Sequence, residues 1–162
     1  MERVFLSKKN ALQRIKAADH ILTQTFPSLK DTRLLLSVIH NIFQALEYCI
    51  SAILYYDRAL RKIPPFHNTF ESKFNVFVNT SVRIHHLQEF VVFIKKVNSI
   101  IKCHKSSPIE FTRNNSFIIC DDNYRMITIN FEELKKMLDE TKRLYFSVEK
   151  ITAHPLQEVE NE

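Results

Sequence analysis

A single run over residues 31–64 limits what this chain can fold into more than any other feature. Drawn as a helix, the run has apolar residues on nearly every side. Asp31 is a suitable N-cap at its start, and the Pro64-Pro65 pair cannot continue a helix at its end. A helix without a polar face has to be covered by other elements. The run therefore predicts a long central helix that is buried in a bundle.

Other amphipathic stretches supply the partners of this helix. Apolar residues recur at helical spacing, with suitable capping residues, and predict four further helices. Their expected ranges are about 7–25, 68–78, 87–105 and 130–152. A break or kink is expected over residues 79–86, where Asn79, Thr80 and Ser81 are poor helix formers.

The chain changes its period before the last helix. Two β-prone runs, 117–120 and 126–129, lie on either side of a polar turn, which predicts a hairpin over about 116–129. We therefore expect a mainly α protein, a bundle of about five helices with a small β-hairpin before the last helix. It should form one domain over residues 1–152, followed by an acidic, flexible tail over 153–162.

The absence of glycine from all 162 residues excludes several enzyme classes. Phosphate-binding P-loops, Rossmann turns and the nucleophile elbow of hydrolases all need backbone conformations that glycine supplies at low cost. Turns must then use Asn, Asp, Ser and Pro. No cofactor is predicted.

The cysteines predict a reducing compartment. Cys49, Cys103 and Cys120 are far apart and have no metal-site spacing, so we expect free, packed thiols and no metal site. No signal peptide is visible at the start of the sequence. The most apolar window, 38–56, contains four polar side chains that would be costly in a bilayer. These features together predict a cytoplasmic protein without a membrane partner.

Charge is unevenly distributed along the sequence. Basic side chains outnumber acidic ones by nine over residues 1–106, whereas the remaining residues are net acidic. Such asymmetry permits a polyanionic partner for the first part, although a lysine-rich surface can also be only solvated. The candidate nucleic-acid-binding residues are Lys8, Lys9, Arg14, Lys16, Lys95 and Lys96.

Arg33 and His40 are the candidate catalytic pair. They are seven residues apart, about two helical turns, so both side chains fall on one face. The pair resembles the Arg-His motif of HEPN ribonucleases, which are small helical bundles that often dimerise across the motif. The resemblance implies that Arg33 would stabilise phosphate charge and His40 would transfer protons. Leu34 departs from the family pattern, which usually has a polar residue there. The structural alternative is an arginine at a helix start and a packed histidine.

A second cluster, His85, His86 and Glu89, contains metal-capable side chains. His86 and Glu89 share a helix face, but one pair is not a metal site, and a capping or solvated role is the simpler interpretation.

The segments 14–27, 63–75 and 120–126 resemble those of a group of small archaeal proteins. This resemblance spans most of the chain and implies no activity.

For function, we expect a non-catalytic interaction module that binds RNA or a helical protein partner through the basic face of residues 1–106. The alternative from a different class is a HEPN-like, metal-independent ribonuclease that uses Arg33 and His40. A homodimer formed through the central helix is a third hypothesis.

Overall fold

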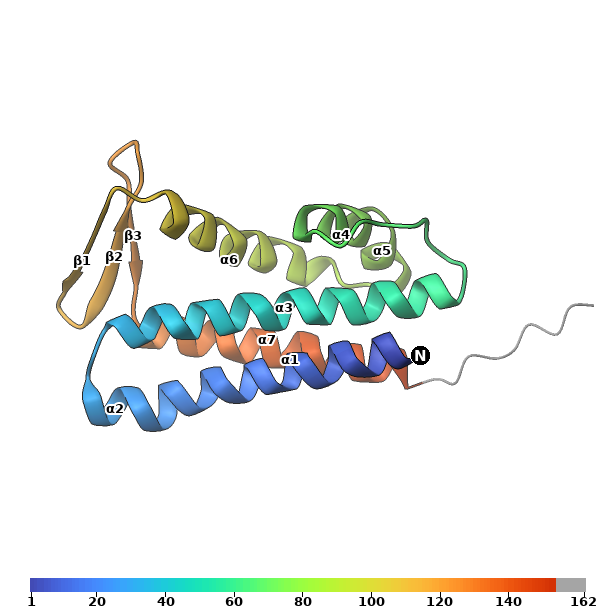
Figure 1. Ribbon diagram of the computed structural model, residues 1–162, viewed down its shortest axis with the longest axis horizontal. Helices are drawn as coiled ribbons and strands as arrows, with labels where there is room; N and C mark the ends of the chain where they lie inside the picture. The colour runs from blue at the N-terminus through green and yellow to red at the C-terminus, as the bar shows by residue number, and fades with distance from the viewer. Residues whose placement is uncertain (154–162) are drawn as a thin grey trace, which may run out of the picture.

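The computed structural model describes residues 1–153, so the predicted tail, 153–162, lies outside the described residues except for Ala153. The described chain is a helical bundle with a small antiparallel sheet before the last helix (Figure 1). The predicted fold class is thereby confirmed.

Five continuous helices make up the bundle, and two of them contain a π-helical stretch. In chain order the helical segments are α1 (Glu2–His20), η1 (Ile21–Thr25), α2 (Phe26–Leu29), α3 (Arg33–Ala59), α4 (Phe70–Val76), η2 (Phe77–Ser81), α5 (Val82–His85), α6 (Gln88–Ser106) and α7 (Phe131–Thr152). The predicted break over 79–86 corresponds to the end of η2 and to His86, which leaves the helix with a positive φ of 57°.

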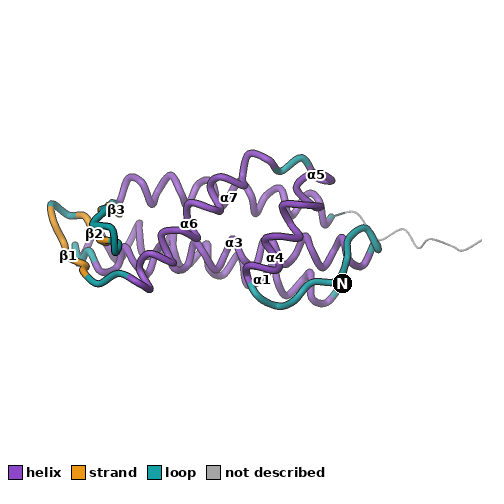
Figure 2. Tube along the Cα trace, turned by 90° about the horizontal axis from the view of Figure 1, so that it is seen from above, coloured by secondary structure: helices purple, strands orange, loops and turns teal. Residues whose placement is uncertain are grey.

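The four long helices run along one axis of the molecule (Figures 1 and 2). Figure 1 shows that α1 and α6 run antiparallel to α3, whereas α7 runs parallel to it. Both α1 and α6 pack on α3 and on α7, but they lie on opposite sides of α3. This arrangement separates the surface of α1 from the surface of α6.

The central helix is confirmed, with a shorter range than predicted. α3 contacts α1, α6, α7 and the sheet, and its buried side chains are spread from Leu35 to Asp57, with Ser37 and Gln44 exposed between them. It ends at Ala59, before Pro64, because Arg61 takes a left-handed conformation (φ 56°). By length and composition α3 could cross a membrane, and half of its apolar window is buried inside the bundle.

Three of the predicted helix starts are corrected. Asp31 is not the N-cap of α3, because the helix begins at Arg33 after Thr32, although Oδ1 of Asp31 accepts a hydrogen bond from the N–H of Arg33 at 3.0 Å.

The first helix begins at Glu2 and not at residue 7, because Ser7 lies inside the helix on the buried stripe with Val4 and Ala11. α4 begins at Phe70, two residues after the predicted start at 68, because Thr69 is its cap. The Oγ1 of Thr69 accepts a hydrogen bond from the N–H of Ser72.

The last helix starts where the sequence predicts. Asn130 caps α7, with its Oδ1 accepting from the N–H of Glu133 at 2.8 Å.

The sheet has one strand more than predicted. The hairpin is present as β2 (Ser116–Cys120) and β3 (Met126–Ile129), and β1 (Ile109–Arg113) is added on the other side of β2. Every residue of β1 is exposed, so the strand lacks the alternating pattern that reveals a half-buried strand. Its turn into β2 uses two asparagines with positive φ, Asn114 and Asn115, where other proteins often use glycine.

Candidate nucleic-acid interface

Arg33 lies at the start of α3 and is bound to the carboxylate of Asp31. Its Nε donates to the two carboxylate oxygens at 3.0 and 3.2 Å, and its Nη2 donates to Oδ2 at 2.8 Å. These hydrogen bonds hold the pKa of Asp31 below its usual value. The side chain of Arg33 is 79% exposed. A phosphate could therefore reach Arg33, but it would compete with Asp31 for the same donors.

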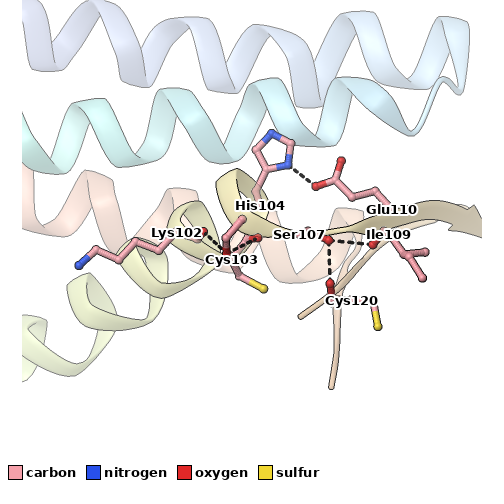
Figure 3. A network of polar contacts seen from close by, with 8 residues as sticks. Lys102, Cys103, His104, Ser107, Ile109, Glu110 and Cys120 are labelled. Carbon is pink, nitrogen blue, oxygen red and sulfur yellow. Dashed lines mark hydrogen bonds and ion pairs between the residues drawn. The ribbon is translucent and has the colours of Figure 1, made fainter. Parts of the chain in front are cut away.

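His40 is packed against a second histidine. Its ring meets the ring of His104 edge-on, with 5.4 Å between the centroids. His104 lies near the end of α6, and its Nδ1 shares a hydrogen bond with Oε1 of Glu110 in β1 (Figure 3). Burial, and then the positive charges of His104 and Lys105, lower the pKa of His40. His40 thus packs on α6 through His104 and favours its neutral form, as a packed histidine does.

A different surface brings basic side chains together, where α1 and α7 lie side by side. Lys142 donates to Oδ1 of Asp19 at 2.7 Å near one end of the pair. Near the other end, Lys8 donates to Thr152 Oγ1 at 3.1 Å and lies 3.3 Å from Glu149 Oε1. These contacts fix the two helices as antiparallel neighbours.

A groove of about 500 Å³ runs between the two helices. Leu12 and Ile15 form part of its apolar lining, and polar side chains come from both helices and from the π-helical stretch η1. These polar residues are Lys16, Asp19, His20, Thr23, Gln24, Lys142 and Tyr145. π-helical stretches are often found at functional sites, where they change the direction of the side chains that follow.

Tyr145 belongs to the fixed wall of this groove. Its hydroxyl donates to Glu149 Oε1 at 2.8 Å, four residues later. Burial and then this hydrogen bond raise the pKa of Tyr145. The phenol is therefore neutral at physiological pH and serves as a hydrogen-bonding group.

Two exposed stripes border the groove, and together they are called the α1/α7 face. The stripe on α1 consists of Phe5, Lys9, Lys16 and His20, and the stripe on α7 consists of Lys142, Phe146 and Lys150. Spacings of four and seven residues place the members of each stripe on one side of their helix. Lys16 and Lys142 line the same groove, so the stripes are adjacent.

Three lysines of the α1/α7 face are not in ion pairs with other described residues. Within the described part of the chain, Lys9, Lys16 and Lys150 have no carboxylate within ion-pair distance. Of the acidic groups nearby, Asp19 and Glu149 are each paired with a lysine, whereas Glu2 and Asp139 are exposed at the helical spacing of the two stripes. The unpaired ammonium groups are therefore available to an anionic ligand.

The other residues of the predicted basic face lie elsewhere. Lys8 is only 20% exposed and connects α1 to α7. Arg14 is exposed, but it lies two residues, about 200°, from Lys16 around the helix. Lys95 and Lys96 are exposed on α6, on the opposite side of α3 from α1, and Lys96 is paired with Glu133. The six predicted residues therefore do not form one surface.

The sequence does not reveal a buried polar cluster at the far end of α3. Asp57 is fully buried, and its two carboxylate oxygens contact Ser81 Oγ at 2.6 Å and His85 Nε2 at 2.7 Å. Ser81 donates to the aspartate rather than to the histidine, so the order differs from that of a hydrolase triad. The cluster ties α3 to η2 and α5. Its members are separated by 24 and 28 residues in sequence, and no local pattern could have joined them.

No metal centre is assembled from the candidate ligands. His85 is turned toward Asp57, and Glu89 is paired with Arg143 at 2.7 Å. Among residues 1–153, no group of three His, Cys, Asp or Glu side chains is placed to hold a metal ion. The three cysteines are free, and burial raises the pKa of Cys49.

Comparison of the chain with protein-family models, with curated proteins and with solved structures gives no match.

Proposed function

We propose that this protein is a non-catalytic helical module that binds RNA through the α1/α7 face. The observation that carries the proposal is the set of unpaired lysines, Lys9, Lys16 and Lys150, on two adjacent stripes. Lys16 lines a groove that also contains neutral hydrogen-bonding groups. Lysine contacts to phosphates supply most of the non-specific affinity of proteins for nucleic acids. Polar groups in the groove add contacts to sugars and bases.

The positions of the basic side chains favour one RNA-binding face rather than two. On α6, Lys96 is paired with Glu133. The lining of the groove between α6 and α7 has more carboxylates than lysines: Glu89, Glu132, Glu133 and Glu140 against Lys96 and Lys136. This excess of negative charge disfavours a phosphate backbone in that groove. RNA is therefore expected on the α1 side of the molecule.

Salt-dependent binding tests this proposal. We expect the binding constant for a labelled mixed-sequence RNA, measured by fluorescence anisotropy, to fall steeply between about 50 and 200 mM salt. The double variant Lys9→Ala/Lys16→Ala should bind more weakly, and its slope of log K against log salt should be smaller by about 1.4, since each contact to a single strand contributes about 0.7.

A matched variant controls for total charge. Lys95→Ala/Lys105→Ala removes two exposed lysines from α6 and should leave the slope unchanged. Equal losses in both double variants would show binding by net charge alone and would contradict the proposed face. Absence of affinity at low salt would contradict RNA binding itself, and a protein partner would then be the remaining hypothesis.

The second candidate function is the HEPN-like ribonuclease. The neutral state of His40, next to the His104–Glu110 pair, favours it, because a general base must be unprotonated at working pH. The engagement of Arg33 by Asp31 opposes it. The RNA from the binding samples, run on a denaturing gel, decides the question, since intact RNA after prolonged incubation excludes this activity.

A further inference from the structure

Two phenylalanines are exposed within the basic stripes of the α1/α7 face. The side chains of Phe5 and Phe146 are 68% and 60% exposed. Phe146 lies four residues after Lys142 and four residues before Lys150, so its ring is flanked by an ammonium group on either side along the helix. Phe5 lies four residues before Lys9, as Phe146 lies four residues before Lys150. An alternation of aromatic rings and lysines is the arrangement that single-strand-binding surfaces use.

The contact between Lys150 and Phe146 shows how this arrangement is held. The Nζ atom of Lys150 lies 4.4 Å from the centroid of the ring of Phe146. The ammonium group is attracted by the π-face and has no carboxylate partner among the described residues. Because the lysine side chain is long and exposed, its ammonium group can move from the ring to a phosphate when a base stacks on the ring.

We infer that the α1/α7 face binds single-stranded rather than double-stranded RNA, with an unpaired base stacked on Phe146 and with Lys150 at the neighbouring phosphate. This inference rests on the proposed function. In a duplex the faces of the bases are covered by their neighbours, so an exposed phenyl ring gains no stacking partner. A single strand can turn a base outward onto the ring while its backbone follows the lysines.

Binding of a single strand and of a duplex of the same sequence tests the inference. We expect the intact protein to bind the single strand more tightly than the duplex. Phe146→Ala should weaken single-strand binding by about fivefold or more and leave duplex binding unchanged, given the usual contribution of one stacked base. Phe146→Tyr, which keeps a ring, should retain the affinity, whereas Phe146→Leu, which keeps only apolar area, should behave like the alanine variant.

A fluorescent base analogue gives a second measurement. Stacking on Phe146 should change the emission of a 2-aminopurine in the bound strand, and Phe146→Ala should abolish that change. Phe111→Ala, at an exposed phenylalanine of β1, is the matched control and should have no effect.

The outcomes separate the two proposals. Equal affinity for single strand and duplex, together with an unchanged Phe146→Ala variant, would overturn this inference while the lysine dependence upheld RNA binding. Failure of the intact protein to bind either RNA at low salt would overturn both.

Discussion

At the scale of single residues, the least expected feature is the buried carboxylate of Asp57. Its two oxygens are hydrogen-bonded to Ser81 of η2 and His85 of α5. These two segments belong to the helix α4–η2–α5, which covers the end of α3 and is called the composite helix. The side chain of His85 is only 12% exposed, so the contact between the two residues is largely shielded from solvent. Buried polar groups are costly without partners, and each member of this cluster therefore depends on the others.

Removal of one member should destabilise the fold. Asp57→Ala leaves the hydroxyl of Ser81 and the imidazole of His85 without their partner, and we expect a loss of about 3 kcal/mol in the free energy of unfolding. Chemical denaturation measures this loss. The control variant Asp139→Asn, at an exposed position of α7, should stay within about 0.5 kcal/mol of the unaltered protein. A similarly small effect at Asp57 would show that the cluster is not a stabilising contact.

At the scale of elements, the chain forms turns and helix ends without glycine. Six residues of the described chain take positive φ, among them Lys30 and His86 at helix ends and Asn114 and Asn115 between two strands. Asparagine tolerates this region, whereas other non-glycine residues pay a steric cost there. The positions with positive φ that are neither glycine nor asparagine are therefore the ones where the residue type fits the backbone conformation least well.

Glycine at one of these positions should therefore stabilise the protein. His86 ends α5 with φ 57° and is exposed, so His86→Gly removes strain and little packing. We expect a gain of about 0.5–1 kcal/mol, measured as a higher midpoint of thermal or urea unfolding. Lys95→Gly, at an exposed right-handed position of α6, should instead lose up to about 1 kcal/mol. A loss at both sites would show that His86 is not strained.

At the scale of the whole molecule, the two ends of the bundle are closed differently. The composite helix α4–η2–α5 covers the far end of α3, and the sheet lies at the end where α3 begins (Figure 1). His40 of α3, His104 of α6 and Glu110 of β1 meet at the sheet end. The junction places two imidazoles and Lys105 close together with one carboxylate.

This junction should make stability depend on pH. Burial and the positive neighbours lower the pKa of His40 in the folded state, so the unfolded chain binds this proton more readily. The contribution of neutral His40 to the free energy of unfolding is therefore complete above the ordinary histidine pKa near 6.5, and it is lost as the pH falls below that value. Between pH 7.5 and pH 5, the free energy of unfolding should decrease less for His40→Gln than for the unaltered protein. Parallel pH profiles would contradict this account.

The sequence by itself determined the elements whose signal is local. The apolar stripes predicted the five helices, Asn130 marked the start of α7, and the polar turn after Cys120 placed the hairpin. Each of these signals depends on residues within a few positions of one another. The spacing of apolar residues that is typical of a helix or a strand can be recognised over that short range. β1 was not predicted, and its residues are all exposed, so the strand lacks the alternation of buried and exposed side chains that is typical of a half-buried strand.

Only the tertiary structure decided which residues meet. It placed Asp57 against His85, His40 against His104, and the lysines of α1 next to α7 rather than next to Lys95. These contacts depend on how whole helices pack around α3, and packing is set by the shape and burial of all the helix faces together. A basic sequence could therefore indicate a polyanion partner, but only the fold showed which side of the molecule has unpaired charge beside exposed aromatic rings.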